Sequence, residues 1–361
     1  VYPGAQHTRF QHSLGAFHLT SEAILSLTQK GVFIFESEAE AVQAAILMHD
    51  IGHGPFSHVL ENTLIHGISH EEISLMMMNE INHDLGDNLT LAIKIFKDEY
   101  PKRFLHQLIS SQLDMDRLDY LRRDSFFTGV TEGNIGSARI IKMLNVVDDN
   151  LVVDSKGIYS IENYLTSRRL MYWQVYLHKT TVGYEKLLVN LLSRAKYLAD
   201  QGETVFATPA LHFFLYNHIN KEAFVDNAEP LQHYKMLDDS DIWASVKAWT
   251  IHRDPILSLL SRNLIDRRIF KVEVRSTVVE EAEVMDIRHQ IAQRYGLSFD
   301  DTAYLVNVST IRKDMYDIHD DHISILYKDG TIKDITEASE ILNISLLSKK
   351  ICKYYLCYQR F

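Results

Sequence analysis

Residues 49–58 read His49-Asp50-Ile51-Gly52-His53-Gly54-Pro55-Phe56-Ser57-His58. This stretch places several imidazoles next to a carboxylate in a short segment that is interrupted by glycines. Imidazole nitrogen and carboxylate oxygen together suit borderline or hard divalent ions such as Mn, Fe, Ni and Zn, and no cysteine lies nearby to favour a softer metal. Glycine lets the backbone approach a site closely and turn away sharply after the ligands. The stretch therefore predicts a divalent metal site.

Helices are predicted on the N-terminal side of this stretch. Apolar residues recur at helical spacing from Phe10 to Lys30, and Gly31 follows as a C-terminal cap. A second helical pattern begins at Glu38 and continues to the glycine that follows Asp50. We therefore expect His49 and Asp50 to lie on the last turn of that helix.

The rest of the chain divides into a helical part and a mixed part. Further helical patterns cover Pro55–Leu64, His70–Asn79, Leu89–Lys97, Lys102–Ser110, Asp114–Asp124, Ser160–Asp200 and Pro209–Asn220. The polar region Asn217–Asp241 is interpreted as a surface excursion. Beyond Arg268, strand patterns with β-branched residues occur at Phe270–Val274, Ala303–Val308, Ile323–Tyr327 and Thr331–Ile335. Asp329-Gly330 between the last two patterns predicts a hairpin.

The predicted fold class is thus mainly α, with a helical core and a smaller C-terminal α+β segment. We expect a catalytic core over residues 1–200, a helical continuation over 201–268 and the α+β segment over 269–361. The last segment contains no second catalytic motif, so regulation or oligomer assembly is the role we assign to it. We expect the natural protein to carry residues before Val1, because the sequence does not begin with Met.

Composition narrows the classes of function. The chain has 361 residues and a formal net charge of −11, which disfavours a surface built for nucleic acid or an anionic membrane. No long apolar run predicts a membrane span, and no signal peptide is readable at the start. The only cysteines, Cys352 and Cys357, do not form a disulfide framework or a zinc ribbon. We therefore expect a cytoplasmic protein that contacts neither membrane nor nucleic acid.

Three motifs in order carry a family resemblance. They are Arg9-Phe10-Gln11-His12-Ser13-Leu14-Gly15, the stretch at residues 49–58, and Asp114-Met115-Asp116-Arg117-Leu118-Asp119-Tyr120. This succession of His, His-Asp and Asp resembles the HD superfamily of phosphohydrolases. Within it, residues 2–180 are most similar to the deoxynucleoside triphosphate (dNTP) triphosphohydrolase branch. The resemblance implies a metal-dependent phosphohydrolase.

The resemblance also implies which residues bind metal and transfer protons. The metal ligands would be His12, His49, Asp50 and Asp116. His53 and His70 match histidines that lie beside the phosphates, and Glu61 matches their acidic partner. We expect His70 and Glu61 to form a general-acid relay, with His53 as a further catalytic residue. The metal would be a divalent ion among Mn, Fe, Ni, Zn and Mg.

The substrate-binding residues follow from the same resemblance. Arg9, Arg117, Arg168 and Lys179 match positions that face a triphosphate, where guanidinium groups bind phosphate oxygens in pairs. Tyr120, Asp124 and Tyr176 match positions that line the sugar. Asp124 would accept a hydrogen bond from a 3′-hydroxyl, and the tyrosines would crowd a 2′-hydroxyl. Arg168 and Lys179 also suit an ordinary solvated helix face, because the surrounding stretch is rich in Arg, Lys and Tyr.

Three functions remain open at this level. The first is hydrolysis of dNTPs to deoxynucleoside and tripolyphosphate. The second is a phosphomonoesterase or phosphodiesterase acting on another nucleotide, since the fold does not decide the substrate. The third is a nucleotide-binding regulator without turnover, which a complete ligand set and a candidate acid disfavour. The resemblance also implies a homo-oligomer and an allosteric nucleotide.

Overall fold

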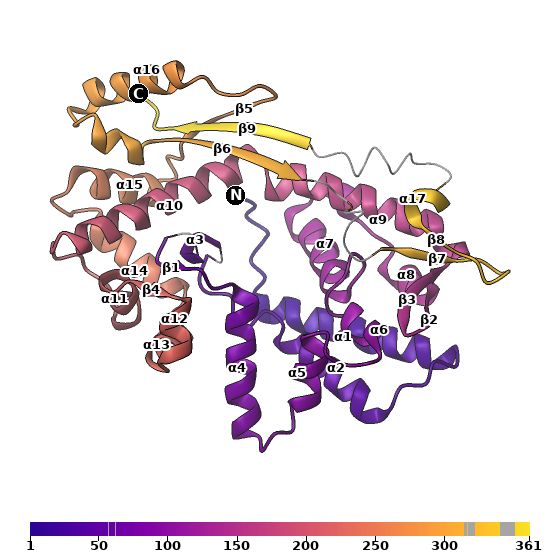
Figure 1. Ribbon diagram of the computed structural model, residues 1–361. Coiled ribbons are helices and arrows are strands. Elements are labelled where there is room, and N and C mark those ends of the chain that lie inside the picture. The colour runs from indigo at the N-terminus through magenta and orange to yellow at the C-terminus, as the bar shows by residue number, and fades with distance from the viewer. Residues whose placement is uncertain (57, 62, 314–315, 317–321, 340–350) are drawn as a thin grey trace. The chain divides into compact units, whose positions relative to one another are not determined.

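The structure is a computed structural model that describes residues 1–56, 58–61, 63–313, 316, 322–339 and 351–361 (Figure 1). Helices dominate it, which confirms the predicted fold class. The chain forms two units, each assembled from separate parts of the sequence. The first unit comprises Val1–Gly52, Ser74–Tyr176 and Lys313–Ile351, and the second comprises His53–Ile73, Leu177–Arg312 and Cys352–Phe361.

The first unit is a helical array with a small sheet. Its helices are α1 (Arg9–Gln29), α2 (Glu36–Met48), most of α4 (His70–Asp84), α5 (Thr90–Phe96), α6 (Arg103–Gln107), α7 (Met115–Thr128), η1 (Thr131–Gly133), α8 (Ser137–Met143), η2 (Ser155–Gly157), α9 (Ile158–Met171), η3 (Tyr172–Tyr176, a π-helix) and α17 (Ile335–Ala338). Its sheet has the order β2-β3-β7-β8, from β2 (Leu144–Val147), β3 (Asn150–Asp154), β7 (Ser324–Leu326) and β8 (Ile332–Asp334). Strands β3 and β7 are parallel, with Val153 opposite Ile325, and the other pairs are antiparallel.

The second unit combines helices with two sheets. Its helices are α3 (His58–Glu61), α10 (Lys179–Asp200), α11 (Pro209–Tyr216), α12 (Lys221–Asp226), α13 (Glu229–Lys235), α14 (Asp239–Trp249), α15 (Pro255–Ile265), α16 (Glu281–Tyr295) and η4 (Asp300–Tyr304). One sheet pairs β1 (Ile65–His66) with β4 (Ile219–Asn220), and the other has the order β5-β9-β6, from β5 (Lys271–Arg275), β9 (Ile351–Tyr358) and β6 (Val306–Lys313).

Buried apolar side chains explain why α1, α2 and α7 form the centre of the first unit. Helix α1 packs against both α2 and α7. Ala16 and Ala23 on α1 and Leu118 on α7 are fully buried, because the small alanines let neighbouring helices approach closely. Helix α1 brings His12 and α7 brings Asp119 into this packing, and the buried His49 is the C-cap of α2. The core therefore fixes the positions of the polar residues described below.

Several predicted elements differ from the structure. Helix α2 ends at Met48, so His49 is its C-cap and Asp50 follows in a turn. The pattern at Ser160–Asp200 is divided into α9, η3 and α10. Asn217–Asp241, interpreted as a surface excursion, contains α12 and α13 instead. Phe224 and Tyr234 on these helices are buried, so the region contributes apolar packing despite its polar composition.

The hairpin predicted at Asp329-Gly330 is confirmed, because β7 and β8 pair on either side and Gly330 has a positive φ of 85°. Residues 57 and 62, which fall within the predicted helix Pro55–Leu64, lie outside the described residues.

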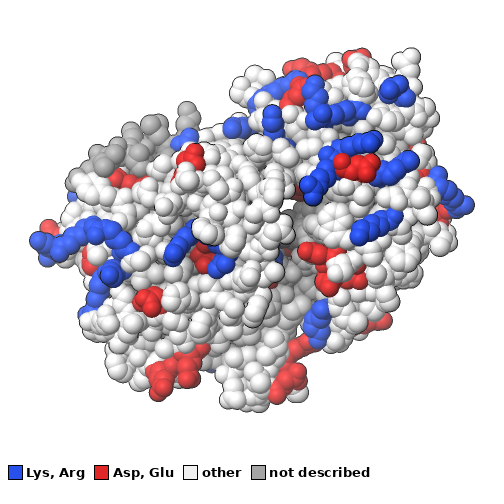
Figure 2. Space-filling model, turned by 180° about the vertical axis from the view of Figure 1, so that it is seen from behind, with Lys and Arg blue, Asp and Glu red and all other residues white. Residues whose placement is uncertain are grey.

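The surface carries charges of both signs. On the face shown in Figure 2, Lys and Arg side chains are interspersed with Asp and Glu, without a broad field of positive charge. Among the described helices, none is long and apolar enough to cross a bilayer.

Candidate functional site

His12 is held on α1 in the interior of the first unit. Thr8 caps this helix by accepting a hydrogen bond from the Gln11 amide, and Gln11 accepts one from the Thr8 amide in return. The cap places His12 one turn inside the helix, on the side that packs against α7. Its Nε2 atom lies 3.0 Å from Asp116 Oδ1 and 3.9 Å from Asp50 Oδ2.

His49 presents a single free nitrogen to the same place. Its Nδ1 lies 2.6 Å from the Ile46 carbonyl oxygen, which requires a proton on Nδ1 and leaves the lone pair on Nε2. This Nε2 is buried and has no hydrogen-bond partner among the described residues. It lies 3.4 Å from Asp50 Oδ1 and 3.5 Å from Asp116 Oδ1. The nitrogen is thus oriented and desolvated in the way expected of a metal ligand.

Asp50 and Asp116 complete this group of four. Asp116 lies in the first turn of α7, two residues after the N-cap Asp114, whose side chain accepts a hydrogen bond from the Arg117 amide. Asp50 accepts a hydrogen bond from Arg9 Nη1 at 2.7 Å. All four predicted ligands therefore come together in the first unit, from α1, from the end of α2 and from the start of α7. Ligand atoms of His12, His49 and Asp116 lie close enough together that these three residues could hold a metal ion.

The electrostatics of this group are strongly coupled. Burial lowers the pKa of His12, but its contacts with Asp116 and Asp119 outweigh burial and raise that pKa to about 10. Burial raises the pKa of Asp116, but the contacts with His12 and His49 outweigh burial and hold that pKa well below its ordinary value. The imidazoles of His12 and His49 therefore lie beside carboxylates that stay ionised. A divalent cation stabilises such carboxylates and competes with protons for the imidazole nitrogens.

The residues fit a divalent metal. Edges of about 3 Å between ligand atoms are expected when nitrogen and oxygen surround an ion at about 2.0–2.2 Å. The shortest His12 to Asp116 separation has this length, and the buried Nε2 of His49 has no hydrogen-bond partner in the part of the chain that the structure describes. Two imidazoles and two carboxylates also match the preference of Mn, Fe and Zn.

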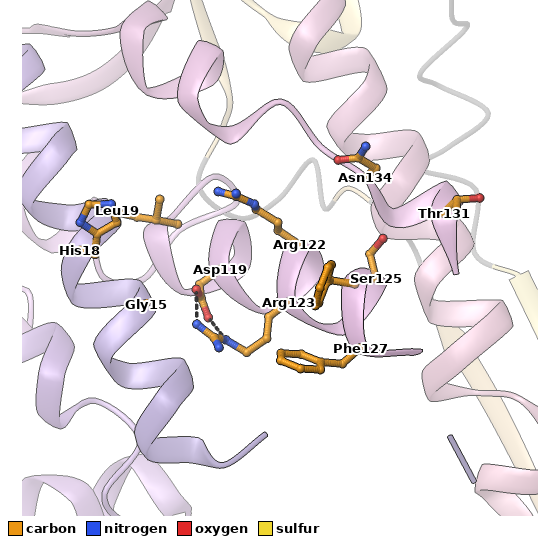
Figure 3. A pocket seen from close by; sticks show the side chains of 11 residues that line it. Gly15, His18, Leu19, Asp119, Arg122, Arg123, Ser125, Phe127, Thr131 and Asn134 are labelled. Atoms are coloured by element: carbon orange, nitrogen blue, oxygen red, sulfur yellow. Dashed lines mark hydrogen bonds and ion pairs between the residues drawn. The ribbon is translucent and has the colours of Figure 1, made fainter. Parts of the chain in front are cut away.

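Behind His12 lies a second layer that fixes its orientation. Asp119 Oδ2 lies 2.7 Å from His12 Nδ1, so the carboxylate accepts a hydrogen bond from Nδ1–H and leaves Nε2 to face the metal group. Arg123, one turn further along α7, donates to both oxygens of Asp119 at 2.7 and 3.0 Å (Figure 3). Gly15 makes room for this pair, because a Cβ at residue 15 would lie 2.0 Å from Asp119 Oδ1.

A polar and aromatic subsite extends from His12 along α7. The His12 and Tyr120 rings are 6.5 Å apart, and Tyr120 and Tyr176 are 6.1 Å apart, both edge to face. Tyr176 donates to Asp124 Oδ2 at 2.6 Å, and His7 Nε2 lies 2.8 Å from the other oxygen of Asp124. The three residues predicted to line a sugar are therefore neighbours, and His7 lies beside them through its contact with Asp124.

The arginines predicted to bind phosphate take different positions in the first unit. Arg9 is partly exposed and bonds Asp50. Arg117 donates from Nε to the Ser111 carbonyl and to Asp114. Arg168 is buried, donates from Nη1 to Gln112 at 2.9 Å, and keeps an Nε without a partner among the described residues. Lys179 is exposed at the start of α10 and belongs to the second unit.

The predicted proton-transfer residues form their own cluster in the second unit. The His53 and His70 rings are stacked, with centroids 3.8 Å apart and an angle of 16° between planes. Glu61 Oε1 lies 3.3 Å from His70 Nδ1. These three side chains also form a possible metal-binding group. The lone pairs of a histidine lie in the plane of its ring, and two stacked rings have nearly parallel planes. Their lone pairs therefore do not converge on one point, so the arrangement suits proton transfer better than a second ion.

Comparison with known proteins identifies the family. The HD domain matches residues 9–124, and an HD-associated region matches residues 135–204. The crystal structure of a phosphohydrolase from Bacteroides thetaiotaomicron is 66% identical, has a TM-score of 0.97 and covers 100% of this chain and 89% of that one. The chain belongs to the HD-domain phosphohydrolases.

Curated relatives of this HD-domain phosphohydrolase differ in how much of their length it spans. The uncharacterized protein YwfO of Bacillus subtilis is 32% identical over 100% of this chain and 83% of its own length. The deoxynucleoside triphosphate triphosphohydrolase SAMHD1 homolog of Dictyostelium discoideum is 31% identical over 54% of this chain and 41% of its own length. Human SAMHD1 is 28% identical over 50% of this chain and 36% of its own length. The phosphohydrolase thus spans less than half of the relatives whose names state a substrate.

Sequence reasoning missed three residues of the phosphohydrolase site. Asp119 stood in a quoted motif without a role, although its spacing of four from Arg123 is a recognisable helical ion pair. His7 likewise received no role, because its partner Asp124 is 117 positions away. Gln112, which accepts from Arg168, carried no signal in the sequence.

Proposed function

We propose that this HD-domain phosphohydrolase cleaves dNTPs to deoxynucleoside and tripolyphosphate. The proposal depends above all on one observation: the His12 group continues through the Tyr120 ring to the pair of Tyr176 and Asp124 within the first unit. A group suited to a metal and to phosphate chemistry is thus joined to a subsite suited to a hydroxylated ring. A nucleotide carries both parts on one molecule.

The sugar subsite supports a deoxyribose. Asp124 is an acceptor whose side-chain oxygens already contact Tyr176 and His7 at hydrogen-bonding distance. A 3′-hydroxyl can join these donors. The flat faces of Tyr120 and Tyr176, packed edge to face, leave an apolar wall where a 2′-hydroxyl would lose its hydrogen bonds to water. Ribonucleotides are therefore disfavoured.

Cationic side chains supply the phosphate contacts of the proposed function. We assign the triphosphate to Arg9, Arg117 and Arg168, and we assign Lys179 to the same role from the family resemblance. The Arg168 Nε is the best-placed donor, because a buried guanidinium nitrogen without a partner gains most from an anionic ligand.

In this proposal His12, His49, Asp50 and Asp116 hold the metal ion. A divalent ion held there polarises a phosphoryl oxygen and lowers the pKa of water. Asp119 keeps the His12 Nε2 lone pair directed at the site. His70 is the proton donor to the leaving oxygen, Glu61 orients the His70 ring through Nδ1, and His53 supports that ring by stacking.

The relatives support the choice of substrate. Two of them carry the words deoxynucleoside triphosphate triphosphohydrolase in their names and match about half of this chain. These matches cover 54% and 50% of this chain, which is more than the HD domain at residues 9–124.

The test is a product analysis. Metal-loaded protein is incubated with each of the four dNTPs, alone and in pairs, and the products are separated by chromatography. We expect deoxynucleoside and tripolyphosphate, and we expect His49→Ala to abolish both. Activity seen only with paired nucleotides would identify allosteric activation. If no dNTP releases a nucleoside, the proposal is wrong, and phosphate release from monoesters or diesters would then indicate the alternative phosphohydrolase activity.

A further inference from the structure

A cavity of about 720 Å³ lies in the first unit, behind the Asp119 side chain that orients His12. Helices α1 and α7 and the segment around η1 line it (Figure 3). Its lining residues are Gly15, His18, Leu19, Asp119, Arg122, Arg123, Ser125, Phe126, Phe127, Thr131 and Asn134. A cavity of this size holds a small organic molecule. None of the residues predicted to bind substrate lines it.

The charge of the lining favours an anion. Arg122 and Arg123 contribute two guanidinium groups, and Asp119 is the only carboxylate among the described lining residues. Arg123 already bonds Asp119, whereas Arg122 makes no hydrogen bond or ion pair with any described residue. A local excess of positive charge is unusual in a chain whose formal net charge is −11. Guanidinium groups bind the oxygens of a phosphate.

The other lining residues indicate a ligand larger than a bare phosphate. Phe126 is 78% exposed, so its ring is free to cover a ligand, and the Phe126 and Phe127 rings meet edge to face at 5.1 Å. Asn134, Thr131 and Ser125 add neutral polar groups to the same cavity. Aromatic rings beside polar side chains suit an organic group that carries its own hydrogen-bonding atoms.

We propose that this cavity binds a small organic phosphate and that its occupancy is coupled to metal binding through Arg123, Asp119 and His12. A phosphate on Arg122 also attracts Arg123, which draws the guanidinium away from Asp119. Asp119 then accepts more strongly from His12 Nδ1, and the His12 Nε2 becomes a better metal ligand. The proposal does not depend on the nature of the substrate.

The coupling makes a reciprocal prediction. If the phosphate raises the affinity for a metal ion, the metal ion must raise the affinity for the phosphate by the same factor. We expect a factor of about five, at the low end of typical allosteric couplings.

The test measures binding of inorganic phosphate and of deoxyadenosine monophosphate to the full chain by calorimetry, with and without Mn²⁺. Arg122→Ala should weaken both ligands at least about tenfold, the loss expected for a charge-assisted hydrogen bond. Arg268→Ala removes the same charge from an exposed position in the second unit and should change neither. Tighter binding of the monophosphate than of phosphate would assign the aromatic residues to the organic group.

The variant Asp116→Ala distinguishes phosphate binding in the cavity from direct binding of phosphate to the metal ion. This variant should lose Mn²⁺ but keep phosphate binding, because Asp116 does not line the cavity. Phosphate binding that survives in Arg122→Ala and disappears in Asp116→Ala would overturn the proposal, as would a complete absence of phosphate binding. Binding at Arg122 with an unchanged Mn²⁺ affinity would overturn the coupling through Asp119.

Discussion

His12 Nδ1 and Asp119 Oδ2 lie 2.7 Å apart, so a buried imidazole of the metal group is fixed by a carboxylate that is not itself a predicted ligand. We expect Asp119→Asn to lower the affinity for Mn²⁺ by about 10–100-fold, the usual cost of removing such a partner. Calorimetric titration with Mn²⁺ measures this directly. Asp154→Asn, which removes a carboxylate paired with Lys30 in the same unit, is the control. An unchanged affinity would show that His12 keeps its orientation without Asp119.

Gly15 tests the same relationship by steric means. A methyl group at this position would lie 2.0 Å from Asp119 Oδ1 and 2.3 Å from Arg123 Nη2. Because both atoms are at the ends of side chains, we expect Gly15→Ala to displace this pair and weaken Mn²⁺ binding by roughly tenfold. The loss of stability should be modest, about 1–3 kcal/mol. Gly136→Ala, where a Cβ meets nothing within 4 Å, is the matched control for both measurements.

These residues also show what could be predicted from sequence. The motif around His49 and Asp50 predicts a metal site, because imidazole and carboxylate groups are typical metal ligands. Asp119 needed the structure, since its function depends on a histidine 107 positions away. A helical aspartate next to an arginine is common on solvated faces, and only the packing of α1 on α7 gives this pair a different role.

The same limit applies to the fold. Amphipathic helices such as α1 and the hairpin of β7 and β8 follow from local patterns. The parallel pairing of β3 with β7 does not, because Val153 and Ile325 are 172 residues apart and each strand is short. The hairpin of β2 and β3 was also missed. Its turn consists of Asp148 and Asp149, which adopt positive φ angles of 49° and 58° without any glycine.

His7 is expected to hold Asp124 in place for the proposed sugar. Its Nε2 contacts one Asp124 oxygen, and its ring stacks on Phe127 at 4.8 Å. We expect His7→Ala to raise the KM for a dNTP about five- to tenfold while kcat changes little, because the lost contact positions the substrate and does not touch the phosphate. His83→Ala, at an exposed histidine, should change neither constant.

A dideoxynucleotide substrate separates this role from a general structural one. It lacks the 3′-hydroxyl that Asp124 would accept, so His7→Ala should have little further effect on its KM. An equal increase for both substrates would mean that His7 stabilises the first unit without acting on the sugar.

Glu38 links stability to pH at a distance from the site. Its side chain is 1% exposed and bonds Lys102, Tyr100 and the Phe35 amide. Burial raises the pKa of Glu38, but these contacts lower it more, to a net value below the ordinary 4.5. The ionised form therefore stabilises the folded chain above about pH 4.5, and this contribution is lost as the pH falls through the lower folded pKa.

We expect Glu38→Gln to lower the free energy of unfolding by about 1–3 kcal/mol at pH 7 and by less at pH 3. Urea unfolding at the two pH values measures the difference. Glu99→Gln, whose carboxylate is exposed and pairs with Lys97, should cost little at either pH. If Glu38→Gln lost the same free energy of unfolding at both pH values, the charge of Glu38 would not be the cause. The effect would then come from packing around residue 38.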